Sequence, residues 1–151
     1  MSQNVLYKLL LLTITIVVFS PHAATGDEPE IYPSSKYPDL PFSEAVAYGG
    51  VLYLSGDIGT GTDGKLVEGG IGPESSQTME NIKATLGRHG LGMGDLIKCT
   101  VFLADISEWP TFNKIYAGYF VKGRYPARSA LAASGLALGA RVELECMAAL
   151  K

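Results

Sequence analysis

The sequence has few of the residues from which metal centres, disulfide frameworks and histidine-dependent active sites are built. Its 151 residues include two cysteines and two histidines. Two cysteines are too few for a disulfide scaffold or a structural zinc site. His22 lies near the N-terminus and His89 directly precedes a glycine, as is typical of a helix end. We therefore expect no metal and no cofactor, and any chemistry must come from carboxylates, arginine, hydroxyls and the backbone.

Positive charge is also scarce. Lysine and arginine together number 12 against 15 acidic residues, which gives a net charge of -3. A protein that coats DNA or RNA needs a basic surface to neutralise phosphates. The composition therefore argues against a nucleic-acid partner.

The N-terminal residues 1–24 have the pattern of a secretory signal peptide. Lys8 is followed by the uncharged apolar run 9–19 and then by small residues that end at Ala23 and Ala24. The run is about half the length that a membrane-spanning helix requires. We expect cleavage near Ala23 or Ala24, with an uncleaved anchor and a disordered tail as alternatives. The expected location is periplasmic or secreted, with no membrane association after cleavage.

The rest of the chain divides into a lead-in and one domain. Residues 25–37 are rich in Pro, Gly, Ser and acidic residues and lack apolar periodicity, which predicts an extended or disordered segment. Residues 38–151 are long enough for a single domain.

Hydrophobic periodicity predicts five strands and two helices in the order β-β-α-β-α-β-β. The first two strands flank the hairpin signal Gly49-Gly50, and a glycine-rich loop separates them from the first helix. The expected ranges are strands 45–48, 51–55, 96–103, 127–133 and 141–150 and helices 73–89 and 107–120. The helices between strands predict crossovers that place both helices on one face of a single sheet.

The last strand indicates what lies on each face of this sheet. Val142, Leu144 and Cys146 alternate with Glu143 and Glu145. The apolar set fits a core covered by helices, and the other face mixes apolar and charged residues. Such a face is a candidate for packing against further copies of the same sheet.

The two cysteines, Cys99 and Cys146, both fall on the apolar face of their strands. We expect buried free thiols in the first place. A disulfide, which export would permit, and a reactive thiol are the alternatives.

Arg128 stands in a strand of otherwise small and apolar residues and must find an anion there. One interpretation is a structural salt bridge to Glu143 or Glu145. The other is a two-point clamp for a substrate carboxylate, with one glutamate placed to handle a water molecule.

Several segments resemble the RidA family, also called the YjgF family, whose name stands for reactive intermediate deamination. The most specific is Pro126-Ala127-Arg128-Ser129, which is followed by Val142-Glu143-Leu144-Glu145. Further matching segments are 41–46, 54–58, 78–86, 98–105, 112–116 and 139–141. The resemblance spans about residues 37–150.

The resemblance implies an α/β (α+β) fold of the chorismate-mutase-like type, which forms a homotrimer through the uncovered sheet face. It also implies hydrolysis of 2-imino acids and their enamine tautomers to 2-oxo acids and ammonia without a cofactor, as in a 2-iminobutanoate/2-iminopropanoate deaminase. Arg128 would then bind the substrate carboxylate and Glu143 would activate the water. The residues expected to complete the substrate site are Asn113, Phe42, Ser55, Gly56, Asp57, Ile58 and Ala130.

The chain departs from the family pattern at three of these positions. Phe42 replaces a tyrosine, Asp57 replaces a glutamine and adds a negative charge, and Ala130 replaces a cysteine. A module that binds a small carboxylate without turnover is the alternative to an imine deaminase. RNA cleavage, attributed to some relatives, fits this acidic chain poorly.

Overall fold

A computed structural model describes residues 28–151 of the chain. The predicted signal peptide and the first residues of the lead-in lie outside the described residues. Within residues 28–151, no helix has the length and apolar character needed to cross a membrane.

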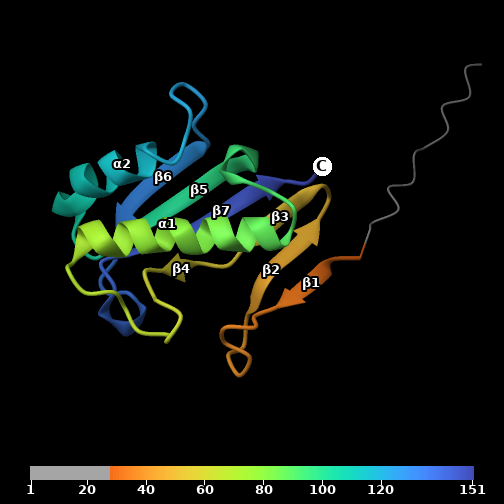
Figure 1. The fold of residues 1–151 in the computed structure, drawn as a ribbon, viewed down its shortest axis with the longest axis horizontal. Coiled ribbons are helices and arrows are strands. Elements are labelled where there is room, and N and C mark those ends of the chain that lie inside the picture. Colours follow the sequence, from red (N-terminus) through yellow and green to blue (C-terminus); the bar gives the residue numbers. More distant parts are fainter. Residues whose placement is uncertain (1–27) are drawn as a thin grey trace, which may run out of the picture.

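The fold is one mixed β-sheet in the spatial order β1-β2-β3-β7-β5-β6, with the short β4 paired to β7 (Figure 1). The strands are β1 (Glu30–Pro33), β2 (Ser43–Tyr48), β3 (Val51–Leu54), β4 (Asp57–Ile58), β5 (Leu96–Leu103), β6 (Ala127–Ala132) and β7 (Val142–Ala149). The β5–β6 pair is parallel and the other pairs are antiparallel. Gly49 and Gly50, with φ of 58° and 78°, form the predicted β2–β3 turn.

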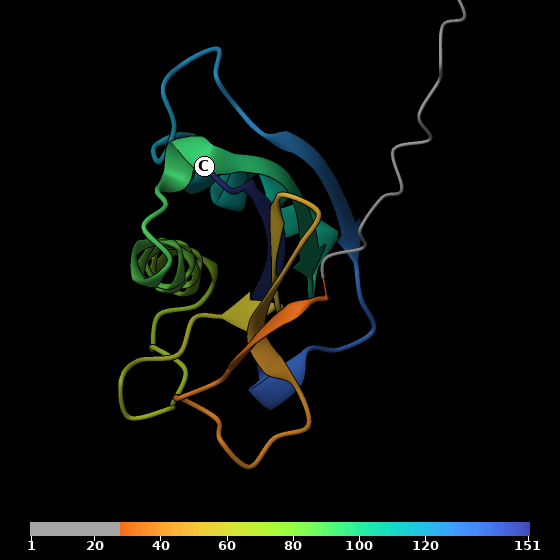
Figure 2. The ribbon, with the colours of Figure 1, turned by 90° about the vertical axis from the view of Figure 1, so that its right-hand side faces the viewer.

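Two helices cover one face of this sheet. They are α1 (Ile71–Arg88) and α2 (Trp109–Ala117), which contact each other (Figure 1). Figure 2, in which α1 is seen end-on, places that helix on one side of the sheet. Short 3₁₀ turns lie at Met93–Asp95, Ile106–Glu108 and Ala137–Gly139. The predicted α+β architecture with two helices and a single sheet is confirmed.

The core forms between the helices and the covered face of the sheet. Met79, Ile82 and Leu86 of α1 are at most 1% exposed, as their spacing predicted. From β7, the alternating residues Val142 and Leu144 are fully buried. The residues that are buried on the covered face are therefore those that the alternating apolar pattern of the sequence predicted.

Three local features differ from the prediction. The short strand β4 lies in the segment that was expected to be a glycine-rich loop, and it pairs with β7. Residues Glu30–Pro33 of the expected lead-in pair with β2, so the sheet begins before residue 38. A β-bulge between Leu96 and Lys98 turns Ile97 outward, and Leu96 takes the buried place that Ile97 was expected to fill. The pairing of a short strand with a distant segment and the presence of a β-bulge both affect only a few residues. Neither therefore produces a recognisable period of apolar residues in the sequence.

Cys99 and Cys146 are joined by a disulfide, which corrects the expectation of free thiols. They are directly opposite each other on the antiparallel strands β5 and β7 and face the core. The sequence placed both on the apolar face, but only strand pairing brings the two side chains within bonding distance.

Candidate active site

The Arg128 side chain lies beneath α2. Arg128 is paired with Cys99 across the parallel β5–β6 ladder, so its side chain is on the helix-covered face. Its Nη2 donates a 2.6 Å hydrogen bond to Oδ1 of Asn113 on α2. The sequence predicted both residues for the substrate site, and the structure brings them together.

Two aromatic rings of the same helix hold the guanidinium. Its Cζ lies 4.5 Å from the ring centroid of Tyr116 and 5.8 Å from that of Trp109. Such stacking fixes the plane of the guanidinium without using its N–H donors. Burial raises the pKa of the Tyr116 hydroxyl to about 12, although the charge of Arg128 opposes the shift. Tyr116 therefore stays neutral, and among residues 28–151 Arg128 forms no ion pair at 4 Å or less.

Arg128 retains hydrogen-bonding capacity for a ligand. Its Nη1 is buried and has no hydrogen-bond partner within residues 28–151. Arg128 and Ala130 line a shallow cavity of about 440 Å³ together with Trp109, Pro110 and the turn before α2. A buried cationic donor beside an open cavity suits a small carboxylate, because an unpaired guanidinium N–H is costly to leave unsatisfied.

Glu143 occupies the opposite face of the sheet. It is paired with Phe102 of β5, whereas the core-facing Cys146 lies three residues further along β7. Successive residues of a strand point to alternate faces, so Glu143 points away from the helices. Burial raises the pKa of the Glu143 carboxyl, and the charges of Glu145 and Asp57 raise it further. A carboxylate with a raised pKa is a stronger base once it is ionised.

Gly56 lies directly against Glu143. A Cβ placed on Gly56 would collide with the Glu143 carboxylate. Ile58 is the partner of Glu143 in the β4–β7 pair. The structure therefore gathers three of the predicted residues, Gly56, Ile58 and Glu143, at the junction of β4 and β7.

Arg128 and Glu143 do not meet within one chain. They are on opposite faces of the sheet, and β5 lies between their strands. Within residues 28–151, neither takes part in an ion pair at 4 Å or less. The interpretation of Arg128 as a structural partner of Glu143 or Glu145 is therefore wrong for the single chain.

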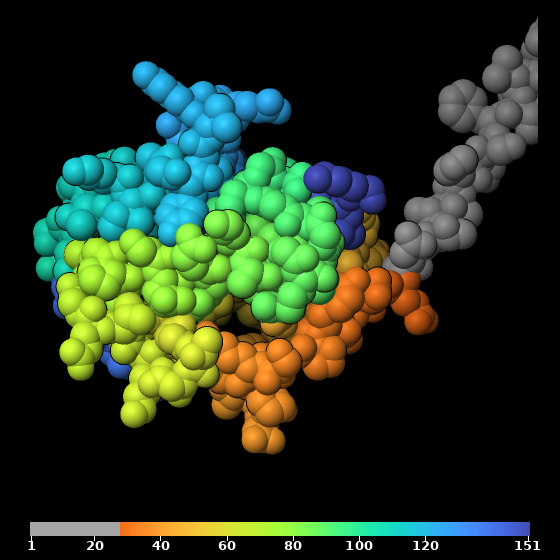
Figure 3. Space-filling view, viewed as in Figure 1, coloured from red at the N-terminus to blue at the C-terminus, as the bar shows by residue number. Residues whose placement is uncertain are grey.

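The structure also contains a second cavity, of about 350 Å³, whose lining includes four of the predicted residues, Gly56 among them. Phe42, Ser55, Gly56 and Asp57 line it. Figure 3 shows this hollow between α1 and the segment that precedes β2. A single chain thus divides the predicted site into one group around Arg128 and another around residues 55–58 and Glu143.

Sequence reasoning missed two roles in this region. It assigned Trp109 and Tyr116 to the apolar stripe of a helix, and it treated Lys36 as part of a flexible lead-in. The aromatic stripe is real, since Tyr116 is 2% exposed, but the same rings also stack on Arg128. The sequence did contain a signal for this role: a helix with an aromatic stripe precedes a strand whose arginine has no evident partner. Nothing in the local sequence links Lys36 to its contact, Thr60.

Within the described part of the chain, no group of three or more His, Cys, Asp or Glu side chains is arranged to hold a metal ion. The arrangement offers instead a guanidinium for an anion and a carboxylate of raised pKa for a proton. These are the groups that hydrolysis of a small acid requires.

Comparison with known proteins gives a consistent match. The family model described as Endoribonuclease L-PSP matches residues 34–150. A human protein named 2-iminobutanoate/2-iminopropanoate deaminase is 39% identical over 109 residues, which is 72% of this chain and 79% of the relative. Protein HMF1 of Saccharomyces cerevisiae is 39% identical over 108 residues, which is 72% of this chain and 83% of the relative.

A solved structure agrees with these sequence matches. A protein of the Rid family from Yersinia pestis superimposes with a TM-score of 0.75 and 35% sequence identity, over 82% of this chain and 100% of that chain. Both the fold and the extent of the matched region are therefore shared. The chain belongs to the Endoribonuclease L-PSP family, the group of RidA and YjgF proteins that its sequence motifs resemble.

Proposed function

We propose that this protein is a cofactor-independent hydrolase that converts reactive 2-imino acids, and their enamine tautomers, to 2-oxo acids and ammonia. The observation that carries the proposal is the Arg128 guanidinium, which is stacked on aromatic rings and hydrogen-bonded to Asn113, and whose buried Nη1 has no hydrogen-bond partner among residues 28–151. The human relative named 2-iminobutanoate/2-iminopropanoate deaminase supports the substrate class.

In the proposed reaction, Arg128 holds the substrate carboxylate by charge-assisted hydrogen bonds. Glu143 removes a proton from a water molecule while the water oxygen bonds to C2 of the imine, and it then passes this proton to the imine nitrogen to give a neutral carbinolamine. The hydroxyl of the carbinolamine next gives its proton to the ionised Glu143, which transfers it to the amine nitrogen. The C–N bond then breaks with its electron pair on nitrogen, the C2 carbonyl forms, and ammonia leaves. Imines hydrolyse readily, so orientation and proton transfer are the main contributions required.

A homotrimer is part of the proposal, because one chain separates its two principal groups. The uncovered sheet face carries Glu143 and Glu145 beside exposed apolar residues such as Tyr53 and Met147. Packing this face against a second copy would remove apolar area from water. It would also let Arg128 of one subunit share a cleft with Gly56 and Glu143 of the next.

Export to the periplasm or the medium is proposed as well. Residues 1–24 carry the signal-peptide pattern. The Cys99–Cys146 disulfide supports this proposal, since such bonds persist mainly in oxidising compartments. Mass spectrometry of the protein purified from its natural host would check both the new N-terminus and the oxidation state.

The deciding experiment is a coupled assay in which an amino acid oxidase or threonine dehydratase generates the imine and its decay is followed. We expect the protein to accelerate decay and Arg128→Ala to lower kcat/KM about 100-fold, as expected for loss of a charged hydrogen-bonding group. Arg124→Ala, an exposed arginine four residues earlier, is the matched control. Equal decay with wild type and Arg128→Ala would overturn the proposal, and carboxylate-dependent thermal stabilisation without turnover would indicate a binding module instead.

A further inference from the structure

An ion pair joins the turn before α2 to the start of β7. Arg141, the residue before β7, donates from Nε to Oε1 and Oε2 of Glu108 at 3.2 and 2.9 Å, and its Nη2 lies 2.7 Å from Oε1. Glu108 is the last residue of the 3₁₀ turn Ile106–Glu108 and occupies the N-cap position of α2. The pair thus connects two segments that are 33 residues apart in the sequence. The proposed hydrolysis uses neither side chain.

The turn that carries Glu108 also forms one wall of the cavity beside Arg128. Four of its residues and near neighbours line that cavity: Ile106, Ser107, Trp109 and Pro110. The ring of Trp109, the residue next to Glu108, has its centroid 5.8 Å from Cζ of Arg128. A shift of the start of α2 would therefore move this ring and the cavity wall together.

Helix α2 needs such an anchor, because it is nine residues long and helices of this length are not stable on their own. Phe112, which is fully buried, anchors the middle of the helix in the core. The same helix carries Asn113, which accepts a hydrogen bond from Arg128, and Tyr116, which stacks on it. The ion pair described above holds the start of the helix against β7. The position of α2, and with it the setting of the Arg128 guanidinium, therefore depends on both anchors.

The backbone of Arg141 is held independently of its side chain. Its N–H donates to Oε2 of Glu74 on α1 at 2.7 Å, and its carbonyl oxygen accepts from the N–H of Ala104 at 3.0 Å. Glu74 is 5% exposed, so this anchor lies in the core. Glu143 follows two residues later on β7. Removal of the Arg141 side chain should therefore release the start of α2 while Glu143 keeps its place.

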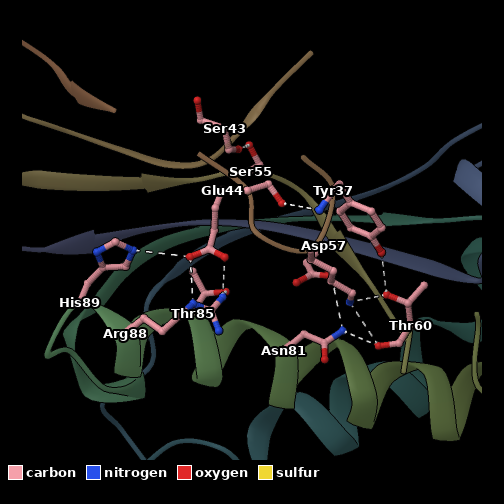
Figure 4. A network of polar contacts seen from close by, with 12 residues as sticks. Tyr37, Ser43, Glu44, Ser55, Asp57, Thr60, Asn81, Thr85, Arg88 and His89 are labelled. Atoms are coloured by element: carbon pink, nitrogen blue, oxygen red, sulfur yellow. Dashed lines mark hydrogen bonds and ion pairs between the residues drawn. The ribbon is translucent and has the colours of Figure 1, made fainter. Parts of the chain in front are cut away.

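The chain contains a second ion pair of the same geometry that is remote from this turn. Arg88 donates to Glu44 from Nε at 3.0 Å and from Nη2 at 2.6 Å, at the C-terminal end of α1 (Figure 4). Glu74 lies near the other end of that helix, about 20 Å away along its axis. Arg88 therefore provides a matched control for the loss of a two-point arginine–carboxylate contact.

We propose that Glu108 and Arg141 are positioning residues of the Arg128 site: their pairing fixes the start of α2, so that Trp109 and the cavity wall stand where the substrate carboxylate must bind. This inference rests on the proposed function. Neither residue touches the substrate, and both act through α2. The side chains of Arg141 and Glu108 are 38% and 20% exposed, and pairs of such exposure contribute little to the free energy of unfolding. Their effect should therefore appear in substrate binding more than in stability.

The first test compares wild type, Arg141→Met and Arg88→Met in the coupled imine assay. We expect Arg141→Met to raise KM about tenfold and to leave kcat within about twofold, because the carboxylate is held alike in the ground state and the transition state. Arg141→Lys, which keeps the charge, should recover part of the loss. Arg88→Met should keep the KM of wild type. A KM of Arg141→Met equal to that of wild type would overturn the inference.

The second test needs no turnover. Trp109 is the one tryptophan of the chain, so its fluorescence reports on the start of α2. Titration with 2-oxobutanoate, a 2-oxo acid of the product class, should change this emission, and Kd should rise about tenfold in Arg141→Met but not in Arg88→Met. Glu108→Gln and the double variant Glu108→Gln/Arg141→Met should match Arg141→Met, because two residues that act as one pair have non-additive effects.

The two tests separate failure of this inference from failure of the proposed function. If wild type neither accelerates imine decay nor binds 2-oxobutanoate, the proposed function is wrong and the inference is wrong with it. If wild type hydrolyses the imine or binds 2-oxobutanoate, and Arg141→Met does so equally well, only the inference is wrong.

Discussion

Arg128 and Glu143 lie on opposite faces of the same β-sheet. Arg128 shares the face of its β5 neighbour Cys99, and Glu143 lies on the face opposite to Cys146, to which Cys99 is bonded. One chain cannot apply both groups to one small substrate, because the sheet itself stands between them. If both act on the same molecule, they must come from different subunits.

Mixed oligomers test this requirement directly. In the proposed homotrimer, Arg128→Ala alone or Glu143→Gln alone should leave the protein nearly inactive. Random mixing of the two variants should restore about one quarter of the sites, because each intact site needs one unmodified residue from each of two neighbouring subunits. Imine decay would be measured after co-refolding or co-expression with two affinity tags. Complete lack of recovery, in mixtures shown to contain mixed trimers, would contradict the shared site.

Glu143→Gln should slow hydrolysis and change the pH dependence of stability. Loss of a general base typically lowers the rate by about 10² to 10⁴-fold, which should appear in kcat. The pKa of Glu143 is raised in the folded protein, so its ionisation opposes folding. The glutamine variant should therefore match wild type in stability at pH values below the ordinary glutamate pKa. It should become relatively more stable as the pH rises through the raised folded pKa.

Urea unfolding of wild type and Glu143→Gln across that pH range measures the effect. Glu145→Gln is the matched control, since Glu145 is on the same strand and face and is more exposed than Glu143. A larger gain in stability at acid pH than at neutral pH would contradict the assigned direction.

Gly56→Ala should displace the Glu143 carboxylate and leave the fold intact. The added methyl group would occupy the position of the carboxylate, which is the flexible end of a side chain and can move. A shift of about 1 Å at a catalytic group can cost about 100-fold in rate. We expect kcat to fall by a factor of that order, with the urea midpoint nearly unchanged. Gly94→Ala, where an added Cβ meets no atom within 4 Å, is the control.

Reduction of the Cys99–Cys146 disulfide should destabilise the domain. The bond closes a loop with a sequence separation of 47 residues, and a loop of that size corresponds to about 4 kcal/mol in the chain-entropy model. Urea unfolding with and without a reducing agent would measure the difference. The variant Cys99→Ala/Cys146→Ala should be insensitive to the reductant, and an equally large effect of reductant on that variant would exclude the disulfide as the cause.

The periodic elements could be predicted from the sequence because the period of apolar residues reflects burial on one side. Met79, Ile82 and Leu86 on α1, and Val142, Leu144 and Cys146 on β7, have the burial that their spacing indicates. β1 could not be predicted in this way. It is a four-residue strand whose place depends on pairing with β2, and its residues are mostly exposed.

For the candidate site, the sequence by itself determined which groups are available: one arginine in an apolar strand, two glutamates on alternate positions of another strand, and very few other reactive groups. Tertiary structure decided how they are combined. Strand pairing joined Cys99 to Cys146, placed Arg128 under the rings of α2, and set Glu143 on the far face. These outcomes depend on register between segments that are distant in sequence, which local residue patterns do not encode.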